Sequence, residues 1–346
     1  MLDREDDQPG DAGAPRSLRG GQGLTPERIE TEVEHAVEAL AEDGYTVIEG
    51  LLDDAEVDEL REVSERWIER QRHERYDPGD GPTHPDDVAI ETYVHNMYDT
   101  APQEELERVL LLFRYNRAAN RHTPWPVPIE QVLKNFIPRP EIEGHGGTVY
   151  VASTPPVEPI FARLVEDPTL LRLARSMLGD DCVLADMGLN SIGPGTDNGN
   201  WHVDVPLGQL PEPLPDFPLT VQNVWMIDDF TEANGATRVV PRSHLTRRKP
   251  GWNSGGFEEE EIAITGPAGS MAIWLSSTWH KPGANVTDRA RRAVLCYFSR
   301  SWVKGYSDLR SLVTEKQAAA MSPTQRYLLG ISANAPVRRG PEPDSE

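Results

Sequence analysis

The second half of the chain is divided into short apolar runs that begin and end at Gly, Pro or Asn. Apolar runs of this length between turn-forming residues are typical of β-strands. No crossover helix is evident between them, and parallel neighbours require one, so the pattern favours an antiparallel β-sandwich or barrel over a parallel α/β sheet. The strands are expected at residues 181–192, 219–230, 235–241, 269–275 and 291–302.

The sequence pattern of the first half predicts mainly helices. This half is expected to pack on the β-rich half to form one structural unit. Apolar residues at helical spacing follow Pro26, which suits a first turn, and Thr25 can cap the helix that they form. A strand and further helices should follow. The expected elements are a helix at 25–44, a strand at 44–52, a helix from Asp53 or Asp54, a helix at 103–120 and two helices within 159–179.

The two ends of the chain differ from the rest in composition. Residues 1–24 are acidic and rich in Gly and Pro, without the apolar segment of a secretory signal, so we expect a disordered leader. Residues 336–346 are similar and are expected to form a flexible tail. Residues 25–335 are expected to form a single domain, with a helical part at about 25–180 and a barrel-rich part at about 181–305.

Composition limits the partners of the chain. The 346 residues carry a formal net charge of -23, which repels nucleic acid and anionic membranes. No apolar run approaches the length of a membrane span. Cys182 and Cys296 lie far apart in apolar runs, which indicates reduced, buried thiols and a cytoplasmic location. The sequence therefore disfavours nucleic-acid and membrane partners, and it leaves the oligomeric state open.

A histidine and a carboxylate stand two positions apart in the segment NWHVDVP, residues 200–206. Alternate side chains of a strand point to one face, so His202 and Asp204 can bind the same ion or small ligand. The pattern alone is weak evidence, because a hydrogen-bonded loop would also accommodate it. A metal site requires at least a third ligand.

His280 is the candidate for that third ligand. It follows the apolar run GSMAIWL and precedes a Pro-Gly turn, so it lies at a strand–loop boundary as His202 does. Two imidazoles and one carboxylate suit non-haem Fe(II) and leave three coordination positions open, although zinc also uses such ligands. Solvated or structural roles are expected for the other histidines, which are His35, His73, His84, His95, His122, His145 and His244.

Arg291 follows His280 and opens a predicted strand. Alternate residues from Arg291 to Tyr297 should share one face of that strand, whereas Arg292 shares the other. If the first face lines the interior, the Arg291 guanidinium is buried and needs an anionic partner, such as a dicarboxylate bound in a bidentate fork. The alternative is a solvated position beside Arg289 and Arg292.

Together these segments resemble the phytanoyl-CoA dioxygenase family of Fe(II)/2-oxoglutarate oxygenases, which includes ectoine hydroxylases. Each motif is loose by itself, but their order and spacing are specific. Residues 70–180 take little part in the resemblance. The matching segments are EDGYTVIEGLLDDAEVDELR (42–61), WHVD (201–204), ANGATRVVPRSH (233–244) and HKPGANVTDRARRAVLCYF (280–298).

The resemblance implies both a fold and a site. The fold would be mainly β with a helical N-terminal half, built on a double-stranded β-helix of the jelly-roll or cupin-like type. Fe(II) would bind to His202, Asp204 and His280. Arg291 would hold the distal carboxylate of 2-oxoglutarate, and Asn190 would be a further cosubstrate contact.

The resemblance also implies an oxidative reaction. O2 and 2-oxoglutarate would be consumed, succinate and CO2 released, and a C–H bond of a small metabolite oxidised, most simply to an alcohol. Related halogenases lack the ligand carboxylate, so Asp204 favours hydroxylation, desaturation or ring formation. The alternative is a cupin-type metal protein that is hydrolytic, isomerising or non-catalytic. The additional His or Glu ligands usual in that type are not evident near His202.

Arg242 departs from the family, which commonly has Gly at this position of the segment PRSH. Either the backbone here is ordinary, or the side chain faces the mouth of the site. In the second case Arg242 would hold an anionic group of the substrate. Residues 70–150, with aromatics such as Tyr93, Tyr98 and Trp125, are expected to cover the mouth as well.

Overall fold

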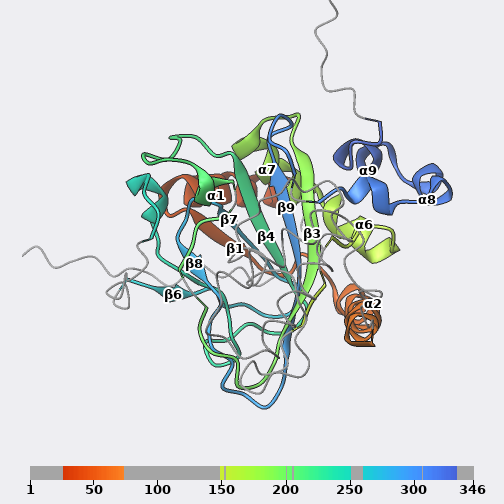
Figure 1. The fold of residues 1–346 in the computed structure, drawn as a ribbon, viewed down its shortest axis with the longest axis horizontal. Coiled ribbons are helices and arrows are strands. Elements are labelled where there is room, and N and C mark those ends of the chain that lie inside the picture. The colour runs from red at the N-terminus through yellow and green to blue at the C-terminus, as the bar shows by residue number, and fades with distance from the viewer. Residues whose placement is uncertain are drawn as a thin grey trace, which may run out of the picture.

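Two antiparallel β-sheets form the centre of the computed structural model (Figure 1). The larger sheet has the strand order β1-β7-β4-β9-β3-β2, and the smaller sheet has the order β6-β5-β8. The larger sheet consists of β1 (Tyr45–Ile48), β2 (Val149–Val151), β3 (Val183–Ile192), β4 (Thr220–Met226), β7 (Met271–Leu275) and β9 (Arg291–Ser299). The smaller sheet consists of β5 (Arg238–Val239), β6 (Ile262–Ala263) and β8 (His280–Lys281). The structure describes residues 26–73, 149–151, 153–199, 201–204, 206–250, 260–305 and 307–332.

The predicted antiparallel arrangement is confirmed, because every strand pair within the two sheets is antiparallel. Within the described ranges the sheets remain separate and do not close into a barrel. The predicted strand at 235–241 is much shorter than expected, since only β5 pairs there. The three strands β2, β6 and β8 were not predicted, because two or three residues carry no readable alternation.

The helices of the first half agree with the sequence pattern where the structure describes them. They are α1 (Pro26–Glu42), α2 (Asp54–His73), α6 (Pro159–Val165) and α7 (Pro168–Leu178). None of them combines the length and apolar composition needed to cross a bilayer. The predicted helix at 103–120 lies outside the described residues, as do residues 74–148 altogether. A helical N-terminal half therefore stays a prediction.

Asp167 shows why the segment 159–179 forms two helices and not one. Its carboxylate accepts hydrogen bonds from the backbone N–H groups of Thr169 and Leu170, at 2.9 and 3.0 Å, and so caps α7. The same carboxylate pairs with the Arg163 guanidinium on α6 at 2.7 Å. Pro168, at the first position of α7, needs no N–H partner there.

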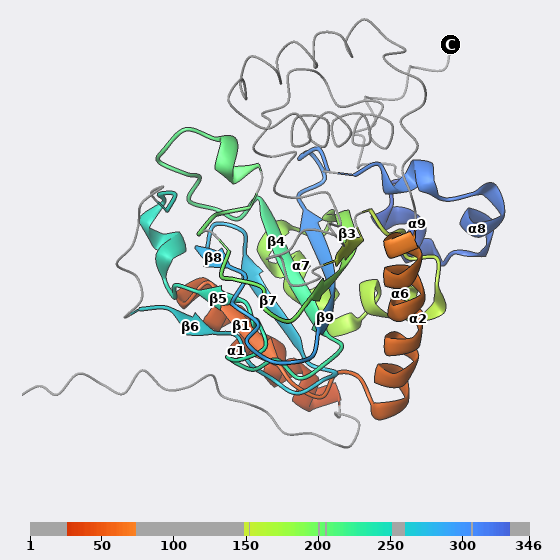
Figure 2. The same ribbon diagram turned by 60° about the horizontal axis from the view of Figure 1, so that its bottom comes forward.

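The larger sheet has one face on the helices and the other on the smaller sheet. Alternate residues of a strand point to opposite faces, so β9 contributes to two apolar clusters. Val294 and Phe298 lie in the cluster that includes Leu40 of α1 and Leu173 of α7. Ala293 belongs to a second cluster, which the smaller sheet covers. Figure 2 shows α7 behind the larger sheet and the short strands of the smaller sheet on its other side.

Two short helices follow the sheets, α8 (Glu315–Ala320) and α9 (Pro323–Leu328), and neither was predicted. Each begins with a capping box, in which Thr314 pairs with Gln317 and Ser322 with Gln325. Six residues are too few to show an apolar period, but the reciprocal Ser/Thr and Gln spacing is a readable signal for a helix start.

Gly269, just before β7, has a positive φ of 83°, and an added Cβ would lie 2.8 Å from the Leu52 backbone oxygen. Gly269→Ala is expected to lower the free energy of unfolding by about 2–5 kcal/mol. A left-handed backbone costs about 1–2 kcal/mol, and overpacking adds about 1–3 kcal/mol. Denaturant unfolding measures the loss. Gly195→Ala is the matched control, because Gly195 has a φ of 75° but open space around it. Equal losses in the two variants would contradict a role for the close contact.

Candidate metal centre

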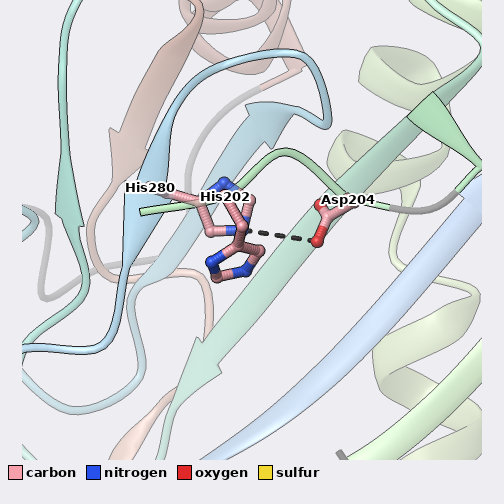
Figure 3. A group of neighbouring side chains, drawn as sticks. All are labelled: His202, Asp204 and His280. Carbon is pink, nitrogen blue, oxygen red and sulfur yellow. Dashed lines mark ion pairs between the residues drawn. The ribbon is translucent and has the colours of Figure 1, made fainter. Parts of the chain in front are cut away.

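The backbone brings His202 and His280 side by side. The two residues exchange backbone hydrogen bonds at 3.0 and 3.1 Å in an isolated antiparallel bridge. Two residues further along, the N–H of Asp204 donates to the Ser276 carbonyl at 2.9 Å. The segment 201–204 therefore lies beside β8 like an added strand, and alternation turns His202 and Asp204 toward the same side. Figure 3 shows the three side chains meeting above the larger sheet.

The possible ligand atoms of these three residues all lie within 4.8 Å of one another. His280 Nε2 is 3.3 Å from Asp204 Oδ1, and the two imidazole rings have centroids 4.2 Å apart. His280 is buried, Asp204 is half-buried and His202 is exposed, so the cluster is open on one side. Two nitrogen ligands and one carboxylate at this spacing suit a divalent transition metal with free coordination positions.

Hydrogen bonding fixes the direction of His280. Its Nδ1 lies 2.8 Å from the Thr278 carbonyl oxygen, so Nδ1 carries the proton and donates it there. Nε2 is then the free ligand atom, in the arrangement that metal-binding histidines commonly have. The second oxygen of Asp204, Oδ2, is buried and has no partner among the described residues. A buried carboxylate oxygen without a partner is costly, and a metal ion would satisfy it.

Electrostatics keep Asp204 in its ligand form. Burial by itself would raise the pKa of Asp204, but His280 and His202 beside it hold that pKa below its usual range. Burial would lower the pKa of His280, and the adjacent Asp204 carboxylate raises it above its usual value. The carboxylate is therefore anionic at neutral pH, as a metal ligand must be.

Arg291 lies in the same cleft, which has a volume of about 550 Å3 including its solvent-open mouth. The side chain is 3 % exposed. Its Nη1 donates to Asn190 Oδ1 at 3.3 Å, its Nη2 donates to the Gly235 carbonyl, and the guanidinium lies 4.2 Å from the Phe230 ring centroid. Its Nε has no partner, and no carboxylate of the described residues forms an ion pair with it. Burial lowers the pKa of Arg291 to about 9, although Asp228 opposes the shift.

The two faces of β9 separate Arg291 from its neighbour. Arg291, Ala293 and Leu295 line the cleft, as the alternation predicts. Arg292 points to the other face and pairs with Asp228 and Glu65, at 2.8 and 3.0 Å. The alternative in which Arg291 lies at the surface beside Arg292 is therefore wrong.

Arg242 lies away from the cleft. It is exposed, it does not line the cleft, and its backbone N–H donates to the Asp43 carbonyl at 2.9 Å. Its φ of 64° is left-handed, a conformation that Gly adopts without strain, in agreement with the Gly that the family resemblance leads us to expect at this position. The backbone here is thus not ordinary, and yet the side chain does not face the site. Its position gives no support to a role in holding an anionic substrate.

Arg242→Gly is expected to leave ligand binding unchanged. The free energy of unfolding should stay the same or rise by up to about 1 kcal/mol, because Gly adopts φ > 0 without strain but loses more entropy on folding. Thermal unfolding and a titration with any substrate test this. A weaker substrate affinity in this variant would restore the hypothesis that Arg242 binds the substrate.

Sequence reasoning missed several residues that line the cleft, among them Gln222, Trp274 and Lys281. Trp274 has its ring centroid 5.3 Å from that of His280. Lys281 pairs with Glu261 at 2.7 Å and lies over the Trp201 ring. Lys281 could have been proposed from its place beside His280, but Gln222 and Trp274 emerge only from the strand register. Of the other histidines, His244 contacts the Ala41 carbonyl through Nε2 at 3.2 Å and takes no part in the cluster.

A family model described as phytanoyl-CoA dioxygenase matches residues 40–293 of the chain. The match covers more than half of the chain, and the chain belongs to the phytanoyl-CoA dioxygenase family. The matched residues include His202, Asp204, His280 and Arg291. The predicted family is confirmed.

Two curated relatives carry dioxygenase names. Dioxygenase af480 of Aspergillus fumigatus is 25% identical over 205 residues, which cover 58% of this chain and 65% of that protein. Ectoine dioxygenase of Streptomyces anulatus is 24% identical over 168 residues, 41% of this chain and 56% of that protein. The matched stretches thus span less than two thirds of either relative. A solved structure of the epimerase SnoN with Fe3+, alpha ketoglutarate and nogalamycin RO gives a TM-score of 0.49 at 17% identity, covering 79% of this chain and 85% of that one.

Proposed function

We propose that the chain is a non-haem Fe(II)/2-oxoglutarate-dependent dioxygenase that oxidises, most simply by hydroxylation, a C–H bond of a small molecule. Succinate and CO2 are the co-products. The observation that carries the proposal is that two histidines and a carboxylate converge in a cleft with a buried arginine, for which the described ranges provide no anionic partner. Membership of the phytanoyl-CoA dioxygenase family and the dioxygenase names of two relatives support it.

His202, Asp204 and His280 are the proposed ligands of Fe(II). When bound, the ion supplies O2 activation coupled to the oxidative decarboxylation of 2-oxoglutarate. The protein contributes the orientation of the ligands, which comes from the backbone bridge between the histidines and from the Thr278 carbonyl behind His280. Asp204 would hold one coordination position of the ion, which would favour transfer of oxygen over transfer of a halide.

Arg291 is the proposed anchor of the distal carboxylate of 2-oxoglutarate. Its buried Nε is an unused donor, and a carboxylate would satisfy that atom together with a terminal nitrogen in a bidentate fork. Asn190 orients the guanidinium through Nη1 and lines the same cleft. Apolar side chains of Val224, Ala293 and Leu295 line the cleft beside it and keep water away from the charged pair.

The single-domain organisation over residues 25–335, with a leader at 1–24 and a tail at 336–346, is part of the same proposal. The fold would be a double-stranded β-helix, in which the smaller sheet faces the larger one. A shared apolar cluster of α1, α2, α6, α7 and the larger sheet supports one unit. The two cysteines are free and buried, which supports a cytoplasmic location.

A cupin-type metal protein without redox chemistry is the competing function. It would explain the three metal ligands, but it gives no reason for a buried arginine that lacks an anionic partner. Unpaired buried charges are expensive, so a site retains one where a ligand completes it.

Purified protein supplied with Fe(II), ascorbate and 2-oxoglutarate tests the proposal. Succinate should form only when O2 is present, and a metabolite extract should raise its rate and yield a product of shifted mass. With zinc in place of iron, no succinate should form. Succinate formation that does not depend on iron and O2, or its complete absence with iron bound, would contradict the proposed function.

A further inference from the structure

The face of the larger sheet that carries the cleft continues beyond it to a second carboxylate, Asp186. The strand registers place Trp274 opposite Gln222, Gln222 opposite Tyr297, and Tyr297 opposite Asp186. Directly opposed residues of antiparallel strands project to the same face. Trp274 and Gln222 line the cleft beside the metal ligands, so Asp186 stands in the same row two strands further along. At roughly 4.8 Å per strand, that is roughly 10 Å from Gln222.

Asp186 has hydrogen bonds but no counter-charge among the described residues. The Ser307 hydroxyl donates to its Oδ1 at 2.7 Å, and Ser307 in turn lies 2.7 Å from the Ser153 hydroxyl. No lysine, arginine or histidine among the residues that the structure describes pairs with Asp186. The residue as a whole is half-buried. Burial raises the pKa of Asp186 to about 6, while the Ser307 hydrogen bond opposes the shift.

Tyr150, on the edge strand β2, lies next to the β3 segment that carries this carboxylate. It pairs with Asn190 in the sheet, and its hydroxyl is 3.0 Å from where a Cβ of Gly188 would be. The phenol ring therefore lies across Gly188, toward Asp186. Burial raises the pKa of Tyr150, and the charges of Asp186 and Asp204 raise it further, which places the hydroxyl within the field of both carboxylates. No hydrogen bond joins that hydroxyl to any of the described residues.

We propose that Asp186 and Tyr150 form the substrate-binding end of the cleft, and that the primary substrate carries an ammonium or guanidinium group that pairs with Asp186. The proposal rests on the proposed function, which places the reacting carbon at the metal end of the same row. Tyr150 would accept or donate a hydrogen bond to the same part of the substrate. The cation would satisfy the carboxylate that lacks a counter-charge.

A positively charged substrate is also consistent with the net charge of the protein. A net charge of -23 attracts cations and repels anions over the surface, which speeds the approach of a cationic substrate. This reverses the expectation from sequence, in which Arg242 would have selected an anionic substrate. Arg291 does not compete for Asp186, because Gly188 and Asn190 separate the two along β3.

A purely structural role for Asp186 is the alternative. Ser307 follows β9, and its bond to Asp186 ties that segment to β3. Asp186→Asn separates the two roles, since the amide oxygen can still accept from Ser307 while the charge is gone. Ser307→Ala makes the opposite change and keeps the charge. Asp180→Asn is a further control, because Asp180 is an exposed carboxylate shortly before β3, and its loss changes the net charge by the same amount.

The test measures ligand binding to the full chain by NMR or calorimetry at physiological salt. The probes are n-butylammonium and n-butylguanidinium, with n-butanol as the uncharged counterpart. Both cations should bind at least about tenfold more tightly than the alcohol, and Asp186→Asn should remove that preference, because a hydrogen bond to a charged group contributes about 1.5–3 kcal/mol, or roughly 10- to 100-fold. Ser307→Ala and Asp180→Asn should retain it. Asp186→Ser replaces Asp186→Asn if the latter does not fold.

Equal binding of the cations and the alcohol, no binding of the cations, or a preference that survives Asp186→Asn would overturn the inference. None of these outcomes requires iron or turnover, so they are independent of the proposed function. Iron- and O2-dependent succinate formation without a cation preference would leave the dioxygenase in place and remove only the subsite. A cation preference without succinate formation would do the reverse.

Discussion

His280→Ala is expected to abolish Fe(II) binding and the turnover of 2-oxoglutarate. His280 is buried, its Nε2 is 3.3 Å from Asp204, and the Thr278 carbonyl holds its other nitrogen, so no nearby histidine of the described residues can replace it. Changes to groups that only orient metal ligands already cost about 10- to 100-fold in metal affinity or activity. Loss of the ligand itself should lower turnover by at least about 100-fold. Metal content after reconstitution and succinate formation are the two measurements.

The same result is expected for His202→Ala, whose imidazole completes the cluster from the opposite strand of the bridge. His35→Ala is the matched control, since it removes an exposed imidazole on α1. It should bind iron as the unmodified chain does. Full turnover in His280→Ala with iron bound would show that the metal lies elsewhere.

Arg291→Ala is expected to raise the KM for 2-oxoglutarate by at least about 30-fold. Truncating one partner of a buried, hydrogen-bonded charge pair costs about 2–5 kcal/mol, and 1.4 kcal/mol corresponds to tenfold. Arg291→Lys should recover little of the loss, because a single ammonium cannot form the bidentate fork. Steady-state kinetics with varied 2-oxoglutarate give the value, and iron content and thermal unfolding show whether the fold and the metal site persist.

Arg289→Ala provides the comparison, because Arg289 is exposed two positions before Arg291. Its KM for 2-oxoglutarate should be close to that of the unmodified chain. An unchanged KM in Arg291→Ala would place the cosubstrate carboxylate on another cation and remove Arg291 from the site.

The architecture was predictable where a helix or strand is long enough to show a regular pattern of apolar residues. The strands β3, β4, β7 and β9 each have enough residues for apolar runs between turns, and α1, α2 and α7 have clear apolar faces. The short strands β2, β5, β6 and β8 depend on pairing partners that are distant in the chain, and such pairing leaves no local signature. Their bounds could not be derived from the sequence.

Those site residues that lie at the ends of strands could be predicted from the sequence. The pattern His202-x-Asp204 and the histidine after a long apolar strand were readable. Alternation separated the face of Arg291 from that of Arg292 but did not say which of the two faces lies inside. The expectation for Arg242 was wrong because neither backbone φ nor side-chain direction is visible in a sequence. Its φ of 64° is a conformation that favours Gly, and its side chain does not line the cleft. Asp186 was missed because its place on the cleft-bearing face of the larger sheet depends on the register of three strand pairs.

His202, Asp204 and His280 are proposed to bind Fe(II) and to leave adjacent positions for 2-oxoglutarate, which Arg291 would anchor. An anaerobic titration with Fe(II) and then 2-oxoglutarate tests it most directly, because chelation of Fe(II) by an oxo acid produces a visible charge-transfer absorption. We predict that this absorption appears with the unmodified chain only after both are added, saturates at one iron per chain, and is absent in His280→Ala. Stoichiometric iron without the absorption at saturating 2-oxoglutarate, or the same absorption in His280→Ala, would contradict the account.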